Sequence, residues 1–510
     1  EAKQAAAVSG LSQAPRSHVL AALHEHSGRP LVAVCQDDLA ASRLASELGA
    51  FLGEQPPVLP SRELTLAGAI GVSRQWEQKR LRLLYALAQG QVPVLVTSLD
   101  ALLLRTMPRE VLFSASVRLR CGAEYNVDNL VARLTRAGYT RASLVEGVGQ
   151  FALRGGILDV YSPACENPLR AEFFGDELDT MGYFDPITQR RTENVEEAVL
   201  LPVAETEAHL HPQGTAGLCE DLRAIIARQQ RRKTPNQALI GTLQKDCEAL
   251  ENETLFASAD RYMALIYPEF TTAAAYLSQE AVVAFCDHGN LQRAEKEKAE
   301  EFGLLLDSFL TSGTLFGELC DYYGSIEDLA AQLRGRAVVY CDGFLAARYP
   351  ESLPPKKLLS FTARQLPGYG GSLETAASDL KNYAANQYGS IVLCGGQRRG
   401  EILKDLLAQN GLNALLAFPL TKLPQPGQIL LAPGSLPAGL EYPTLKFAIL
   451  TEGQIAVRQE RKKTRAPKKA TNRKKLDSFT DLTPGDLVVH EHHGIGRYVG
   501  MEQLKVGGVT

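Results

Sequence analysis

The sequence predicts a multidomain α/β protein, and three observations support this class. Buried-strand and helical patterns alternate in residues 1–118, short strands and turns fill 119–205, and a second alternation of strand and helix occupies 353–456. Alternating strands and helices are typical of parallel sheets, and closely spaced short strands of antiparallel ones. At roughly 100 to 200 residues per domain, a chain of 510 residues corresponds to several domains.

The first domain begins with the alternation that predicts its parallel sheet. Short apolar runs predict buried strands, and apolar residues with a helical period predict amphipathic helices. In chain order we expect a helix over 18–26, a strand over 31–36, helices over 37–51 and 75–89, and a strand over 92–97.

The run from Gly10 to Ser17 has part of the spacing of a phosphate-binding loop, G-x-x-x-x-G-K-[ST]. Gly10 and Ser17 match this pattern. Pro15 replaces the second glycine and removes an N–H, and Arg16 replaces the lysine with a wider planar fork. The sequence also has no acidic box after an apolar strand to hold magnesium. We therefore expect an ATPase fold that has lost its nucleotide site and has no catalytic residue; a coincidental spacing is the alternative.

The inserted segment 119–205 contains the most informative stretch of the chain, Arg154 to Pro186. Residues 169–174 have the two-residue period of a strand, so alternate side chains point to opposite sides. Leu169, Ala171 and Phe173 form the apolar side, and the other side carries Arg170, Glu172 and Phe174.

A hairpin is expected around this strand. Gly175 and Asp176 supply a two-residue turn with glycine first, and residues 177–184 form the returning strand. Arg154 is expected to begin the strand over 157–161.

The polar side of this hairpin predicts a protein-binding surface. A rigid aromatic ring between opposite charges is typical of interface hot spots, because ring and arginine fork lose little entropy on docking. The alternative is that Phe174 lies under another domain and that both arginines are solvated.

Residues 206–352 return to a mostly helical pattern and complete the first domain. The segment includes the charged run 293–301 and ends with a strand over 337–341. The small α/β domain that follows shows no recognisable chemistry, and its loop 395–400 fits a structural turn better than an anion site. Its expected elements are a strand over 390–394, a helix over 400–409 and a strand over 445–450.

The composition changes again at a basic linker, 457–478. Ten of the eighteen residues from 458 to 475 are Lys or Arg, so this segment cannot bury a core. A solvated tether is the simpler interpretation, and a salt-sensitive contact with DNA phosphates is the alternative.

The final segment, 479–510, predicts strands over 486–490 and 497–501 around a turn at Gly494 and Gly496. A metal site is disfavoured because no further ligand stands at regular spacing from the three histidines His490, His492 and His493. About thirty residues are too few for a complete barrel domain, so the module is expected to be truncated.

Composition excludes other classes of protein. The net charge of −4 gives no global sign of nucleic-acid binding. The nine cysteines form no CxxC pair, which favours reduced thiols in a cytoplasm over disulfides. No run approaches the ~18 apolar residues of a membrane span, and no leader marks export. The chain starts without methionine and stops within an unfinished pattern, so we expect a fragment.

The stretch from Arg154 to Pro186 resembles the small interaction domain of the nucleotide-excision-repair subunit UvrB. It is more similar to the matching module of the bacterial transcription-repair coupling factor family. The resemblance extends to Leu59–Pro108 and returns at Asp481–Gly500. The tyrosine-rich DNA-clamping hairpin of UvrB has no counterpart between Leu59 and Pro108, which favours the coupling factors.

The resemblance implies a fold and two partner sites. The first domain is expected to be a degenerate P-loop, helicase-like domain, and residues 479–510 the start of an SH3-like or Tudor-like barrel. That barrel grips the RNA polymerase β subunit in the family, and Leu504 falls in the contact by motif position. The UvrA-binding residues implied in the same way are Arg154, Arg170 and Phe174, with Glu172 and Asp176 nearby.

The resemblance also implies an activity for the longer protein. Members of the family use ATP and magnesium to move along double-stranded DNA in the bacterial cytoplasm, displace stalled RNA polymerase and recruit UvrA. This chain is expected to recruit partners without a cofactor and without catalysis. A nucleotide-driven UvrB-like helicase or nuclease-loading subunit, and a non-enzymatic scaffold, remain alternatives.

Overall fold

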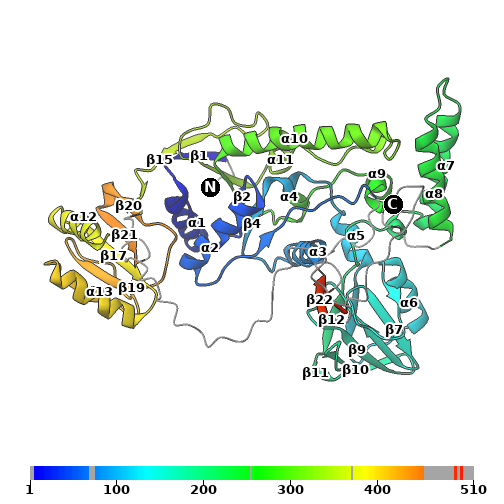
Figure 1. The fold of residues 1–510 in the computed structure, drawn as a ribbon, viewed down its shortest axis with the longest axis horizontal. Helices are drawn as coiled ribbons and strands as arrows, with labels where there is room; N and C mark the ends of the chain where they lie inside the picture. Colours follow the sequence, from blue (N-terminus) through cyan, green and yellow to red (C-terminus); the bar gives the residue numbers. More distant parts are fainter. Residues whose placement is uncertain are drawn as a thin grey trace. The chain divides into compact units, whose positions relative to one another are not determined.

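The computed structural model describes residues 5–67, 75–252, 256, 258–368, 372–452, 487–490 and 494–497. The chain forms two compact units, residues 1–457 and 458–510, and each is described by itself. The first unit contains both helices and strands (Figure 1), and the strands of its largest sheet are parallel, so the predicted α/β class is confirmed. Among the described residues, no helix is long and apolar enough to cross a membrane.

A sheet of seven parallel strands forms the core of the first unit, in the order β15, β1, β14, β13, β2, β4, β3. The strands β2, β4 and β13 are buried along their whole length because core clusters cover both faces. The seven strands are β1 (Ala5–Ser9), β2 (Leu31–Cys35), β3 (Val58–Leu59), β4 (Val94–Ser98), β13 (Val282–Cys286), β14 (Ala337–Cys341) and β15 (Lys357–Ser360).

Helices cover this sheet from both sides. On one face, α1 (Gln13–Ser27) and α2 (Asp38–Leu52) bury leucines and alanines against the strands. On the other face, α3 (Gln75–Ala88), α4 (Leu99–Leu103) and the packed pair α7 (Gly214–Gln230) and α8 (Gln237–Glu251) belong to the largest core cluster. The other helices of this part are α5 (Arg109–Ala115), α9 (Met263–Ile266), α10 (His288–Thr311) and α11 (Ile326–Gln332), with 3₁₀ turns at Ala208–Leu210, Ala259–Tyr262, Ala273–Tyr276 and Gly317–Leu319.

The inserted segment forms its own sheet, in the order β11, β10, β9, β8, β7, β6. Helix α6 (Val127–Arg136) packs Leu130 and Leu134 against the inner face of this sheet. The entry strand β5 (Val117–Arg120) pairs with the exit strand β12 (Glu197–Leu200), so both ends of the insert lie together. The strands are β6 (Thr140–Arg141), β7 (Gln150–Arg154), β8 (Ile157–Val160), β9 (Leu169–Phe174), β10 (Glu177–Phe184) and β11 (Arg191–Asn194).

The small α/β domain has a six-stranded sheet in the order β16, β20, β21, β17, β19, β18. It packs on the core domain: Ala14 of α1 shares an apolar cluster with Leu440, and His18 Nδ1 lies 2.8 Å from the Tyr442 hydroxyl. Its elements are β16 (Arg364–Gln365), α12 (Leu373–Ala385), β17 (Gly389–Cys394), α13 (Gln397–Gln409), β18 (Ala414–Leu416), β19 (Ile429–Pro433), β20 (Leu440–Tyr442), a 3₁₀ turn (Pro443–Leu445) and β21 (Phe447–Thr451).

Several predicted elements need correction. The sequence pattern missed β1 and β13, and β13 is a central strand inside a segment predicted to be mostly helical. Strand β15 lies after the predicted boundary at residue 353, yet it pairs with β1 in the main sheet. Arg154 ends β7 and does not begin the following strand.

In the second unit, β22 (Leu487–His490) pairs antiparallel with β23 (Gly494–Arg497). The predicted strand over 486–490 is therefore confirmed. The predicted turn was wrong, because Gly494 and Gly496 lie within β23, opposite His490 and Val488. The SH3-like or Tudor-like barrel stays a prediction.

Candidate functional site

The outward side of strands β7 to β11 carries the predicted protein-binding residues, and we call it the outer face. Along β9, Leu169 and Ala171 are fully buried against α6, whereas Arg170 and Glu172 are half-buried on the opposite side. Phe174 is 84% exposed. The predicted alternation is confirmed, and within the part of the chain that the structure describes no other domain covers Phe174.

A buried carboxylate organises the two predicted arginines. Asp159 on β8 is fully buried and stands opposite Arg170 on β9. Arg170 donates from Nε to Oδ1 at 2.7 Å and from Nη2 to Oδ2 at 2.9 Å, and Arg154 donates to the same carboxylate. The hydrogen bond to Asp159 raises the pKa of Arg170.

This arrangement corrects the expectation for the arginines. They are not simply solvated, as the alternative required, because one internal carboxylate already holds both. The Arg170 guanidinium also lies 4.5 Å from the centroid of the buried Phe184 ring. One negative charge against two positive ones leaves a fixed, positive, planar surface that suits an acidic partner.

A third arginine, Arg191 on β11, was missed by the sequence analysis. Its guanidinium lies 3.7 Å from the Glu172 carboxylate and donates to the Thr180 hydroxyl at 3.4 Å. It crosses the sheet above Gly182, where an added Cβ would lie 2.6 Å from the Arg191 Nε. The only signal in the sequence was a glycine in the middle of a strand, which often marks such a close approach.

The hairpin tip that presents Phe174 is held in place. Gly175 has φ of 66°, as the first position of the predicted two-residue turn requires, and Glu177 pairs with Phe174. The exposed Asp176 accepts a hydrogen bond on its carbonyl oxygen from the Tyr125 N–H at 2.7 Å. Phe174 is therefore displayed on a pre-organised hairpin, which reduces the entropy lost on binding.

The run from Gly10 to Ser17 follows β1 and continues into the first turns of α1, where a phosphate-binding loop would lie. Two of its polar side chains bond to the run's own backbone, whereas Ser12 Oγ and Arg16 Nε are buried without a hydrogen-bond partner among the described residues. Arg16 turns back to the Leu11 carbonyl at 3.2 Å, and the Ser17 hydroxyl donates to the Ala14 carbonyl at 2.8 Å. Pro15 is buried in the first turn of α1. These contacts agree with a lost nucleotide site, although the nucleotide-free state itself stays a prediction.

Gly10 is expected to be essential for stability, because it has φ of 82° and its Cβ would lie 1.9 Å from the Phe361 carbonyl oxygen. We expect Gly10→Ala to lower the free energy of unfolding by about 2 kcal/mol. Urea denaturation would measure this. Gly28→Ala is the matched control, since Gly28 has φ of 64° with open space around it. Equal losses for both variants would contradict the steric argument.

The structure does not describe several other residues that were predicted to be functional or were considered for a site. Leu504, His492, His493 and the basic run 458–475 lie outside the described residues. Within the ranges that the structure covers, no group of three or more His, Cys, Asp or Glu side chains could hold a metal ion.

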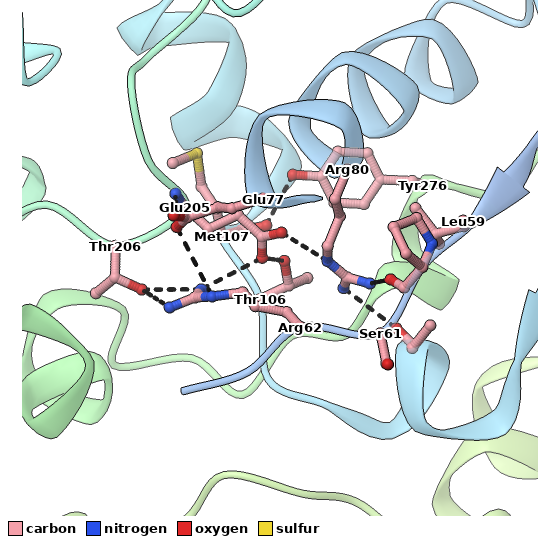
Figure 2. A network of polar contacts seen from close by, with 12 residues as sticks. Leu59, Ser61, Arg62, Glu77, Arg80, Thr106, Met107, Glu205, Thr206 and Tyr276 are labelled. Carbon is pink, nitrogen blue, oxygen red and sulfur yellow. Dashed lines mark hydrogen bonds and ion pairs between the residues drawn. The ribbon is translucent and has the colours of Figure 1, made fainter. Parts of the chain in front are cut away.

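A buried polar network ties the insert to the core domain (Figure 2). Glu205, just after the exit strand, accepts from Arg80 Nε at 2.6 Å and from the Thr106 hydroxyl at 2.6 Å. Arg62 contacts the same carboxylate at 3.5 Å and pairs with Asp260. Burial alone would raise the pKa of Asp260, but the charge and hydrogen bond of Arg62, together with hydrogen bonds from Thr65 and Thr206, lower it.

Known proteins resemble the chain along almost its whole length. Residues 117–205 match the UvrB interaction domain and residues 482–510 match the CarD-like/TRCF RID domain. A transcription-repair-coupling factor of Bacillus subtilis (strain 168) is 25% identical over 98% of this chain and 42% of the relative. That of Staphylococcus aureus (strain USA300) is 27% identical over the same shares. The chain thus spans about two fifths of these relatives, and the predicted resemblance to the transcription-repair coupling factors is confirmed.

Proposed function

We propose that this chain recruits the repair protein UvrA through the outer face, with Phe174 as its anchor. The carrying observation is a phenylalanine that is 84% exposed on a pre-organised hairpin. A large apolar side chain in water has no stabilising role in the free chain, but it becomes favourable when a partner covers it. The UvrB interaction domain match over residues 117–205 supports the same role.

The surroundings of Phe174 indicate how UvrA would be held. Arg154 and Arg170 present guanidinium groups that Asp159 orients, and Arg191 adds a third. Carboxylates on UvrA would accept from these groups while an apolar pocket takes the ring. Glu172 and Asp176 stand beside the anchor and would set charge specificity at its edge.

The second proposed contact is with the RNA polymerase β subunit, through residues 479–510 and Leu504 among them. The CarD-like/TRCF RID domain match supports it. In a longer protein these two contacts would join UvrA to a stalled polymerase in the bacterial cytoplasm. ATP, magnesium and movement along double-stranded DNA would belong to that longer protein, and the basic linker would at most touch DNA phosphates.

A nucleotide-driven UvrB-like subunit is the second candidate, and the nucleotide loop disfavours it. Arg16 already contacts the Leu11 carbonyl, and the Phe361 carbonyl oxygen crowds Gly10. A titration with ATP and magnesium separates the two functions, because only the second candidate requires binding by this chain.

Phe174→Ala is expected to weaken UvrA binding roughly thirty-fold, since loss of an interface anchor costs about 2 kcal/mol. The melting temperature should not change, because the ring makes no core contact. Isothermal titration of the 510-residue chain with purified UvrA would measure this.

The matched control for this experiment is Phe344→Ala, which removes a 93% exposed phenylalanine outside the insert. We expect this control to bind as the unchanged chain does. Equal affinity of the Phe174→Ala variant and the unchanged chain, or no UvrA binding by either, would refute the proposed function.

A further inference from the structure

A second exposed apolar side chain, Ile187, stands at the other end of the outer face. It is 90% exposed in the loop of residues 185–190 that joins β10 to β11. A β-branched residue at a loop tip gains nothing for the free chain by such exposure, so its surroundings decide whether it can serve as an anchor.

The loop that presents Ile187 is closed by its own hydrogen bonds. The Asp185 carboxylate accepts from the N–H of Ile187 at 3.0 Å and of Thr188 at 2.6 Å, and these bonds lower the pKa of Asp185. The Gln189 N–H donates to the Asp185 carbonyl at 2.8 Å, and the Asp185 N–H donates to the Arg190 carbonyl at 3.0 Å. Ile187 is thus pre-organised in the same sense as Phe174.

The loop is also joined to the arginines of the outer face. Arg170 donates from Nη1 to the Gln189 carbonyl at 3.4 Å. The Gln189 side chain donates to the carbonyls of Pro186 at 2.8 Å and Val145 at 3.4 Å. The arginine that Asp159 orients therefore contacts the turn that displays Ile187.

The two exposed residues lie at a separation that one partner can cover. Phe174 pairs with Glu177 at the start of the eight-residue strand β10, and the Ile187 loop follows its last residue, Phe184. At about 3.3 Å per residue, this strand is roughly 26 Å long. A typical interface of about 800 Å² per partner is roughly 30 Å across, so it would reach both ends.

We propose that Ile187 is a second apolar anchor for UvrA, at the opposite end of the outer face from Phe174. This inference rests on the proposed function. The surface on UvrA would have two apolar pockets roughly 25 Å apart, with acidic side chains between them to meet the arginines. In the intervening strip, three arginines pair with the two carboxylates Asp159 and Glu172.

Ile187→Asp is expected to weaken UvrA binding by more than tenfold, because it places an unpaired charge in the apolar pocket. Ile187→Ala is expected to weaken binding about threefold to tenfold. Neither variant should change the melting temperature, since the side chain is almost fully exposed. The titration uses the 510-residue chain and purified UvrA, with Leu304→Asp, at a 74% exposed leucine of α10, as the matched control.

The outcomes distinguish this inference from the proposed function. Binding that is lost with Phe174→Ala but unchanged with Ile187→Asp would overturn the second anchor and leave the first. Absence of binding by the unchanged chain would overturn both. If sedimentation shows that Ile187→Asp abolishes self-association but not UvrA binding, a second copy of the chain covers Ile187 and the inference is wrong. If the loss of binding free energy in the Phe174→Ala/Ile187→Asp variant equals the sum of the losses in the two single variants, two separate anchors are supported.

Discussion

Glu205→Ala is expected to lower the free energy of unfolding by about 3–5 kcal/mol, because it removes one partner of a buried ion-pair network. The Glu205 carboxylate is fully buried and accepts from Arg80 at 2.6 Å, Thr106 at 2.6 Å and Arg62 at 3.5 Å. Without it, the partners that remain for the fully buried Arg80 guanidinium among the described residues are the carbonyls of Pro60 and Ala101.

Guanidinium chloride denaturation would measure this loss. The matched control is Glu197→Ala, which removes an exposed carboxylate of the same insert that pairs with the exposed Arg120. Exposed pairs contribute about 0–1 kcal/mol, so the control should change little. If both variants lost a similar free energy of unfolding, the buried network would contribute no more to stability than an exposed ion pair does. A retained fold with lost UvrA binding would instead show that Glu205 mainly positions the insert.

Local sequence patterns predicted the strands that have one face on a core and the other in solvent. A strand with one face on a core alternates apolar and polar residues, so β9 and its hairpin could be located from Leu169 to Phe184. The same period placed Phe174 on the side opposite Leu169 and Ala171, but its 84% exposure came only from the structure. The missed central strand β13 is a short continuous apolar run inside a helical segment, and such a run fits a strand or a buried helix equally well.

The polar contacts of the site depend on register and on long-range packing, and the sequence alone does not define either. Asp159 meets Arg170 only because β8 and β9 pair in one particular register. The ion pair between Arg62 and Asp260 joins residues 198 positions apart, and that of Arg80 with Glu205 joins residues 125 apart. No local pattern links such residues, so the network and the role of Arg191 came only from the structure.

Asp159→Asn is expected to lower the free energy of unfolding by about 3 kcal/mol and to weaken UvrA binding as well. The substitution keeps the shape of the side chain but removes the charge that Arg154 and Arg170 share. Both guanidinium groups are partly exposed, so water would reduce the cost below that of a fully buried pair. Asp179→Asn, on an exposed carboxylate of β10 in the same sheet, is the matched control.

The effect of Asp159→Asn on binding separates orientation from charge. The net charge of the outer face becomes more positive, so a purely electrostatic attraction to an acidic UvrA surface would strengthen, with a faster association rate at low salt. If Asp159 instead fixes the direction of the two guanidinium groups, the affinity of the variant for UvrA must fall despite the added charge. Without Asp159 the two groups are less ordered before binding, so they lose more entropy when UvrA holds them. Titration well below the melting temperature, at two salt concentrations, distinguishes these cases. Tighter binding by Asp159→Asn would show that the arginines act through charge alone.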